Sequence, residues 1–181
     1  TQPISSVMYG QHNQGARELV FAYMVLKGEG HVIMIDVGLD PEQDDVARRY
    51  VQRDNVVDWQ SPQTVLAKIG LTPEDVDTVL LTHAHYDHMG NLMAFPNAHF
   101  YIQEREYFKW MWAASLPKKF QNMNMAINPN DLQNATTLML NGRLTLVDGL
   151  TEDVLPGIDL VPAYDGHTFA SQMVVINNAS G

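Results

Sequence analysis

The chain alternates between short apolar runs and polar turns, and the first pair of runs predicts a β-hairpin. Residues 19–26 (LVFAYMVL) are apolar and partly β-branched or aromatic, and residues 31–37 (HVIMIDV) have the same character. Between them, KGEG at 27–30 has the composition of a tight turn. We therefore expect two antiparallel strands over these ranges, with Asp36 near the end of the second.

Two cap-and-proline signals and one aromatic stripe predict helices. The pairs DP at 40–41 and SP at 61–62 each place a capping side chain before a proline, which suits the first position of a helix. We expect the first helix to run from this cap to about residue 51 and the second to stop at Gly70. Residues 104–116 carry aromatic side chains at helical spacing and predict a third helix.

Further short runs rich in β-branched residues predict strands that are interleaved with these helices. The predicted strands are 76–81, 97–103, 143–147, 158–161 and 171–177. Strands that alternate with helices in this way are typical of an α/β sandwich. We find no repeat and no linker-like segment, so residues 1–181 are expected to form one domain.

Composition narrows the classes of function. The 181 residues include 11 Lys and Arg against 21 Asp and Glu, which gives a formal net charge of −10. An acidic chain is a poor match for nucleic acid, because affinity for phosphates depends on basic side chains. The sequence contains no cysteine, which excludes disulfides, thiolate nucleophiles and Cys-based metal sites. Any metal ion must therefore be held by His and carboxylate side chains.

The most informative stretch is THAHYDHMGN at 82–91, which follows the predicted strand 76–81. His83 and His85 are two residues apart in extended backbone, so both imidazoles project to the same side and can bind one cation. Asp87 and His88 come after a change in chain direction and could hold a second cation. A bridged pair of metal ions, typically about 3.5–4 Å apart, generates hydroxide at neutral pH. The spacing therefore predicts metal-assisted hydrolysis.

These residues resemble the metallo-β-lactamase superfamily, whose H-x-H-x-D-H signature also follows an apolar strand. VIMIDVG at 32–38 is similar to the family's early strand ending in Asp-x-Gly, and GHT at 166–168 to the element that supplies a further His ligand. The resemblance covers nearly the whole chain and implies a four-layer αββα sandwich. Softer motifs resemble the N-acyl homoserine lactonases, which are quorum-quenching enzymes. These motifs are FPNA at 95–98, YIQERE at 101–106, VDG at 147–149 and VLPGI at 154–158.

The resemblance implies a ligand set and two divalent metal ions. It assigns His83, His85 and His167 to one ion and Asp87 and His88 to the other, with Asp36 as a carboxylate that orients the ligand loop. The family adds a bridging Asp and a last His after the Gly-His-Thr element, and neither is present here. We therefore expect the C-terminal half of the fold to be incomplete in this chain. Zinc is the default for such ligands, with iron or manganese left open.

The function expected from this resemblance is opening of a lactone or similar small cyclic ester. In this hypothesis a metal-bridging hydroxide attacks the carbonyl carbon, and Asp87 helps to relay a proton as the ring opens. Two alternatives stay open at this point. One is an iron-dependent oxygen or sulfur redox enzyme of the same fold, and the other is a non-catalytic metal-stabilised domain.

The region 101–125 is rich in aromatic residues and Met, and about half of it is expected to be core. The remainder could line an apolar substrate pocket or a dimer contact. The residues proposed for the pocket wall are Tyr107, Trp110, Trp112 and Met123.

Plainer interpretations exist for several polar residues. Asp36 could serve only as a strand-end cap, and Asp165 is expected to form a turn. The remaining histidines with no partner pattern are expected to be structural or solvent-facing; they are His12, His31 and His99.

The expected partner is a small-molecule substrate with an apolar portion, without nucleic acid or membrane. A homodimer and a further C-terminal segment of the same protein are left open. The N-terminus lacks the features of a signal peptide, so we expect a cytoplasmic protein. Because the chain begins with Thr, a removed export signal is also left open.

Overall fold

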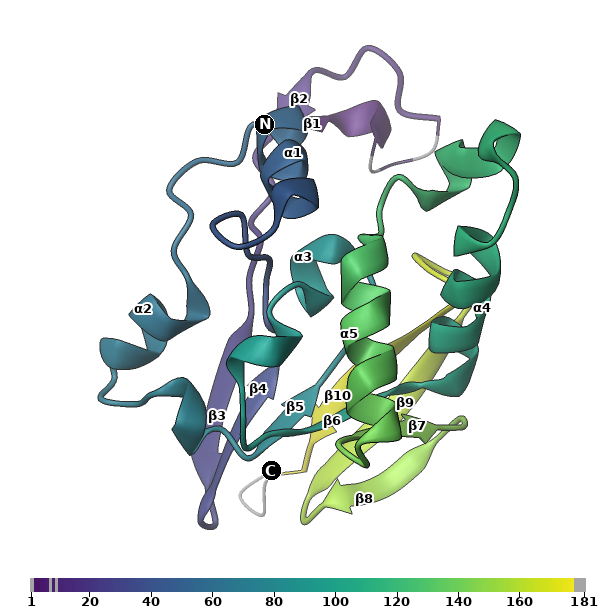
Figure 1. The fold of residues 1–181 in the computed structure, drawn as a ribbon. Coiled ribbons are helices and arrows are strands. Elements are labelled where there is room, and N and C mark those ends of the chain that lie inside the picture. The colour runs from purple at the N-terminus through teal and green to yellow at the C-terminus, as the bar shows by residue number, and fades with distance from the viewer. Residues whose placement is uncertain (1, 7, 9, 178–181) are drawn as a thin grey trace.

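A computed structural model describes residues 2–6, 8 and 10–177 of the chain. Its central feature is a five-stranded sheet in the order β3-β4-β5-β6-β7 (Figure 1). β3 is antiparallel to β4, and the other neighbours are parallel. The strands of this sheet are β3 (Met24–Gly28), β4 (His31–Ile35), β5 (Thr78–Leu80), β6 (His99–Gln103) and β7 (Leu144–Val147).

A second, antiparallel sheet lies behind the first in Figure 1 and has the order β10-β9-β8. Its strands are β8 (Thr151–Leu155), β9 (Ile158–Tyr164) and β10 (Ala170–Ile176). Two short strands, β1 (Gln2–Pro3) and β2 (Ala16–Arg17), pair separately.

Helices cover the opposite face of the five-stranded sheet, so the layers run helix, sheet, sheet (Figure 1). The α-helices are α1 (Asp45–Asp54), α2 (Pro62–Ala67), α3 (Tyr86–Met89), α4 (Glu104–Ala114) and α5 (Pro129–Leu140). Short 3-10 segments are η1 (Ile4–Ser6), η2 (Pro73–Asp75), η3 (Leu92–Ala94) and η4 (Lys118–Asn124). This layering agrees with the predicted metallo-β-lactamase-type sandwich.

The side-chain period of the central strands explains the two-sided core. On β5, Val79 packs in the cluster beneath the helices and Leu80 in the cluster between the two sheets. On β4, Met34 and Ile33 are divided in the same way. Because successive side chains of a strand point to opposite faces, a strand that is covered on both sides is apolar throughout.

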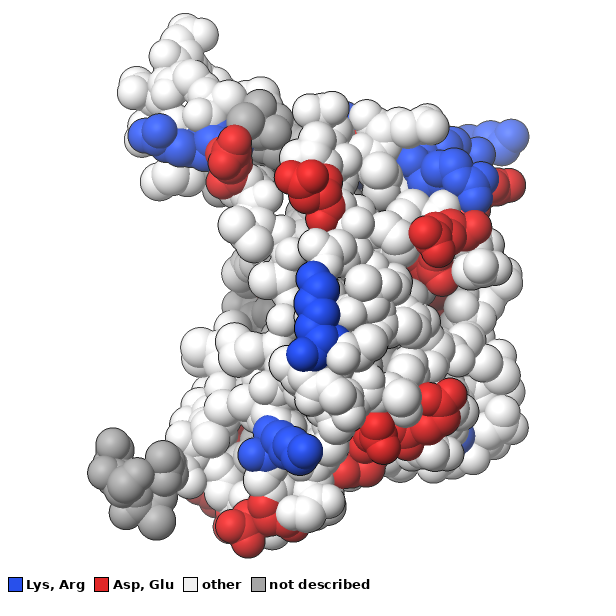
Figure 2. Space-filling view, turned by 90° about the vertical axis from the view of Figure 1, so that its left-hand side faces the viewer, with Lys and Arg blue, Asp and Glu red and all other residues white. Residues whose placement is uncertain are grey.

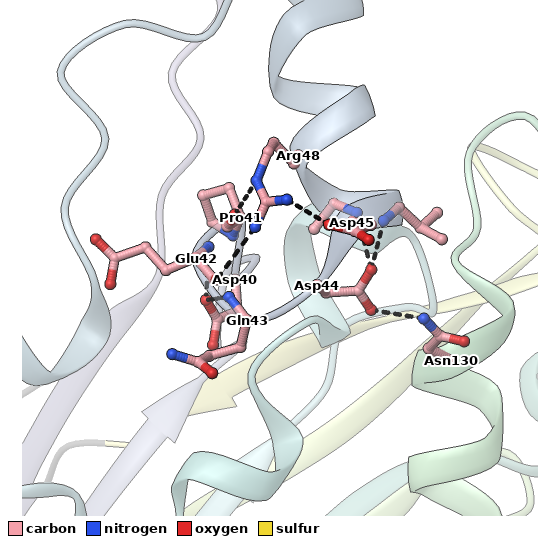
Figure 3. A network of polar contacts seen from close by, with 10 residues as sticks. Asp40, Pro41, Glu42, Gln43, Asp44, Asp45, Arg48 and Asn130 are labelled. Carbon is pink, nitrogen blue, oxygen red and sulfur yellow. Dashed lines mark hydrogen bonds and ion pairs between the residues drawn. The ribbon is translucent and has the colours of Figure 1, made fainter.

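The first predicted helix starts later than the sequence suggested, because the cap is Asp44 and not Asp40. The Asp44 carboxylate accepts hydrogen bonds from the amides of Val46 (2.6 Å) and Ala47 (3.2 Å). Asp40 instead caps the preceding turn, where it accepts from the amides of Glu42 and Gln43 (Figure 3). Competing Asp side chains four residues apart allow either start.

The prediction of the first strand was also wrong at one end. Residues 18–23 have no regular structure, and β3 begins at Met24. The predicted strands at 76–81 and 97–103 and the helices at 61–70 and 104–116 are present, with ends that differ by at most three residues. Helix α5 is one element that the pattern did not indicate. Asn128 caps its start by accepting from the Asn130 amide (3.0 Å), with Pro129 at the first position, so a cap-and-proline signal was missed. Asn128 and Asn130 also donate to Asp44 at 2.9 Å, which ties this start to α1.

Charged side chains form small separate groups on the face drawn in Figure 2, where most of the surface is neither acidic nor basic. Within the described residues, none of the helices has the length and hydropathy needed to cross a membrane.

Candidate metal centre

The site lies where three neighbouring parallel strands end. Asp36 follows β4, the segment with His83 and His85 follows β5, and Glu106 lies in the first turn of α4, directly after β6. The carboxyl ends of parallel strands meet at one edge of a sheet, where ligands of α/β proteins commonly bind. His167 reaches the same place from the turn between β9 and β10 of the second sheet.

Three imidazoles converge at this edge. The ring centroids of His83 and His85 are 4.6 Å apart, those of His83 and His167 are 4.9 Å apart, and those of His85 and His167 are 4.7 Å apart. One ring nitrogen of each lies within 4.8 Å of the others. Three nitrogen donors at this spacing suit a divalent cation such as zinc.

The hydrogen bonds of His83 leave one nitrogen free to bind an ion. The Thr82 hydroxyl donates its hydrogen to Asp36 Oδ2 (2.8 Å), so it accepts from His83 Nδ1 (2.9 Å). His83 Nε2 is buried and has no hydrogen-bond partner among the described residues. A buried nitrogen without a partner is costly, and a metal ion would satisfy it. The donor set therefore fits the metal that this fold family implies.

The pKa values of two of these histidines favour neutral imidazoles, which are the form that binds metal. Burial lowers the pKa of His83 far below its usual range, and the neighbouring rings of His88, His85 and His167 lower it further. Burial and the proximity of His167 lower the pKa of His85 to about 4. Both rings therefore carry a free lone pair at neutral pH.

His88 lies in a different environment, between two carboxylates. Its Nδ1 donates to Asp36 Oδ2 at 2.7 Å, and its Nε2 is 3.4 Å from Asp87 Oδ2. Burial alone would lower the pKa of His88, but the hydrogen bonds with Asp36 and Asp87 outweigh it and raise this pKa to about 9. Asp87 and His88 thus lie together beside the three-histidine cluster, with the His83 and His88 ring centroids 3.9 Å apart.

Asp36 connects the two groups of histidines. It is almost fully buried and has a φ of 60°, a left-handed conformation that Asp tolerates better than most residues. Its carboxylate accepts from the Thr82 amide (2.7 Å), the Thr82 hydroxyl and His88 Nδ1. It therefore holds His88 directly and His83 through Thr82. Its role as an orienting carboxylate stays a prediction that this geometry supports.

A cavity of about 700 Å³ lies next to Asp87. Asp87 belongs to its lining, and the other walls come from the irregular segment 18–23 and the loop 54–60. The apolar side chains of the wall include Leu19, Val20, Phe21, Val56, Val57 and Trp59. The lining is mixed, because charged side chains such as Glu18, Asp58 and Lys68 also belong to it. Apolar walls combined with polar groups are found in many small-molecule sites.

The four residues predicted for the pocket wall lie elsewhere. Tyr107 is in the core, and its hydroxyl bonds to Thr136 at 2.7 Å. Trp112 and Met123 are exposed. Trp110 is buried against the site, with its ring centroid 5.6 Å from that of His85. None of the four is among the residues that line the 700 Å³ cavity, so their substrate role stays a prediction.

Other polar residues have separate structural partners. His31 bonds to Asp77, and His99 bonds to Thr145. Asp165 occupies a turn at a φ of 53° and forms an ion pair with Arg105. His12 is exposed. Sequence reasoning did not single out Glu106, which is completely buried and accepts hydrogen bonds from both histidine loops.

Comparisons with known proteins agree with this geometry. Two curated relatives match parts of the chain. A probable metallo-hydrolase of Methanocaldococcus jannaschii is 45% identical over 42 residues, which is 23% of this chain and 21% of the relative. An N-acyl homoserine lactonase of Bacillus cereus is 28% identical over 102 residues, covering 49% of this chain and 38% of the lactonase.

The fold is also similar to solved structures. An N-acyl homoserine lactone hydrolase with the product N-hexanoyl-L-homoserine at its catalytic metal centre superposes with a TM-score of 0.58 at 20% identity. The match covers 87% of this chain and 58% of the hydrolase, so the chain spans less than two thirds of that protein. The model of the metallo-beta-lactamase superfamily matches residues 16–181. The chain therefore belongs to the metallo-beta-lactamase superfamily.

Proposed function

We propose that this chain carries most of the active site of a metal-dependent hydrolase that opens a lactone or a similar small cyclic ester. One observation carries the proposal: three converging imidazoles, one with a buried nitrogen that lacks a partner among the described residues, lie beside Asp87, which lines a cavity with a partly apolar wall. The similarity to a metallo-hydrolase and to lactonases supports the reaction class and the substrate class.

The residues present would hold two divalent ions, with zinc favoured by the nitrogen-rich ligand set. His83, His85 and His167 would bind one ion, and Asp87 with His88 would contribute to the second. When bound, such ions supply Lewis acidity and lower the pKa of water to near neutrality.

The chain's own side chains supply orientation and proton transfer. Asp36 fixes His88 and, through Thr82, His83 in the tautomers that leave Nε2 available. The apolar wall binds the acyl portion of the substrate and excludes water from it. Water adds to the carbonyl carbon, and the ring C–O bond breaks. Asp87 takes the proton released by the water and returns it to the ring oxygen, so the product is a hydroxy acid.

The test is hydrolysis of N-hexanoyl and N-decanoyl homoserine lactones by the chain loaded with zinc. We expect ring opening, measured by proton release and by chromatography of the acid product, with a lower KM for the decanoyl substrate because of the apolar wall. Asp87→Asn should lower kcat by about 10²–10⁴-fold, the usual range for a lost acid or base.

His31→Ala is the matched control, because its ring bonds to Asp77 away from the site. It should leave kcat unchanged. Tight zinc binding without turnover of either lactone would contradict the proposal and indicate a metal-stabilised domain that is not a lactonase.

A further inference from the structure

The side chain of Glu106 accepts four hydrogen bonds at the base of the histidine cluster. Glu106 is completely buried in the first turn of α4. Its Oε1 accepts from the Ala84 amide (3.1 Å) and from the Trp110 indole (2.8 Å). Its Oε2 accepts from the Thr168 hydroxyl (2.8 Å) and from the Ala170 amide (2.7 Å).

These donors flank the three converging histidines. Ala84 lies between His83 and His85, while Thr168 directly follows His167. The two loops are more than 80 residues apart in the sequence and come from different sheets. One carboxylate therefore joins the loop after β5 to the turn before β10. The distance between the two groups of ligands depends on this connection.

The hydrogen-bond pattern favours a carboxylate over an amide side chain of the same size. All four partners are N–H or O–H donors, so both Glu106 oxygens act only as acceptors. A glutamine would place its NH₂ group against two of these donors. Within the described part of the chain, no Lys or Arg forms an ion pair with Glu106, so the four hydrogen bonds are what satisfy its buried oxygens.

The same carboxylate also orients the side chain that packs on His85. The Trp110 indole donates to Glu106, and the Trp110 ring makes edge contacts with His85 (5.6 Å between centroids) and with Phe169 (4.8 Å). Rotation of Trp110 would therefore open one side of the His85 ring. Glu106 therefore influences His85 in two ways, through the backbone amide of Ala84 and through the side chain of Trp110.

We infer that Glu106 is a positioning residue that holds His83, His85 and His167 at metal-binding distance by joining their two loops. The inference rests on the proposed metal-dependent function, and it adds a residue whose hydrogen bonds within the described part of the chain go to neighbours of the ligands and not to their rings. Partners behind metal ligands commonly change metal affinity by about 10–100-fold when they are replaced. An effect of that size is expected here.

The test uses Glu106→Gln and Glu106→Asp in the full chain, with two measurements. Hydrogen exchange on the metal-free protein should show faster exchange of the Ala84 and Ala170 amides in E106Q. Competition with a chromophoric chelator should show zinc affinity reduced by about 10–100-fold in E106Q. E106D keeps two acceptor oxygens, so it should recover part of the zinc affinity even if it is less stable.

Gln103→Leu is the matched control, because Gln103 is also buried but bonds to Gly149 and Gln172. It should lower stability without changing zinc affinity. Unchanged exchange and affinity in E106Q would overturn the inference while leaving the proposed function standing. A wild-type chain that binds no zinc would instead contradict the proposed function, and the exchange data would still decide whether Glu106 joins the loops.

Discussion

His83 and His88 belong to one six-residue stretch, and their ring centroids are 3.9 Å apart, yet they have opposite protonation behaviour. Burial and three neighbouring imidazoles keep His83 neutral, with one nitrogen that has no partner. His88 lies between Asp36 and Asp87, and its pKa is raised to about 9. The position of the carboxylates, and not the spacing of the histidines, therefore determines which histidines are neutral and able to bind an ion in the metal-free chain.

The three-histidine group and the Asp87–His88 group therefore contribute differently. In the first group, His83 and His85 present neutral donors without any rearrangement of protons. The second group must lose the His88 proton before its Nε2 can bind an ion, because ligands bind metal in the deprotonated form. We expect the first ion to bind tightly to His83, His85 and His167, and the second to bind more weakly and with stronger pH dependence.

Removing a ligand from the neutral group should have the largest effect. His85→Ala leaves two of the three converging imidazoles, and we expect zinc affinity to fall by more than about 100-fold, beyond the range for a lost outer partner. Isothermal titration calorimetry of the metal-free chain measures this change. His99→Ala is the control, since that ring bonds to Thr145. An affinity for zinc that H85A leaves unchanged would show that the ion does not bind to this cluster.

Changing the carboxylate shared by both groups should have an intermediate effect. Asp36→Asn places an amide NH₂ where Asp36 accepts from Thr82 and His88. The hydrogen bond that fixes the His83 tautomer through Thr82 is then weakened, and so is the one that stabilises protonated His88. We expect zinc affinity to fall by about 10–100-fold. We also expect the pKa of His88 to fall from about 9 toward its ordinary value, which histidine NMR titration of the metal-free variant measures.

A His88 pKa that stayed near 9 in D36N would assign the shift to Asp87 instead. The variant Thr82→Val separates the direct effect of Asp36 on His88 from its effect on His83 through Thr82. It removes the hydroxyl that links Asp36 to His83 but leaves the direct bond from His88 to Asp36.

The local parts of the fold and site were predictable from the sequence. The strand β5 is apolar on both faces, and the segment 82–91 directly follows it, so the position of His83 and His85 at a strand end depends on neighbouring residues alone. The cap at Ser61 and the proline at 62 also act within one turn, and α2 begins where they indicate.

Features that depend on distant contacts were not predictable in this way. Helix α5 contains Asn and Thr, which are poor helix formers. It has a local start signal in Asn128 and Pro129, but the contacts of Asn128 and Asn130 with Asp44 come from another element. The cavity wall combines segments 18–23 and 54–60, neither of which has a regular period. His167 was assigned by family resemblance, because nothing in its spacing relates it to His83.

Glu106 illustrates the same limit within a single helix. Glu104 and Glu106 are two residues apart at the start of α4, so they lie about 200° apart around its axis. Glu104 is exposed, whereas Glu106 is completely buried. The residue type is the same at both positions, so only the packing of α4 against the histidine loops shows which Glu is buried.

The smallest expected effect is a pH dependence of stability in the metal-free chain that differs between the two groups. The folded protein raises the pKa of His88, so this stabilisation is complete below about pH 6.5 and is lost as the pH rises through 9. The lowered pKa of His85 acts in the opposite direction, and stability falls as the pH drops from 6.5 toward 4. At about 1.4 kcal/mol per pKa unit, His88 and His85 each contribute at most about 3 kcal/mol to this pH dependence.

Chemical denaturation between pH 4 and 10 with a chelator present measures the free energy of unfolding. We expect it to be largest near pH 6.5, with an acid limb below this pH and an alkaline limb above it. Asp36→Asn should flatten the alkaline limb alone, because it removes the carboxylate that raises the pKa of His88. His85→Ala should reduce the acid limb alone, although His83 continues to contribute to it through its own lowered pKa. Equal flattening of both limbs by either variant would contradict the separation between neutral His83 and His85 and protonated His88. The two groups would then titrate as one coupled unit, and the ions would be expected to bind together and not in sequence.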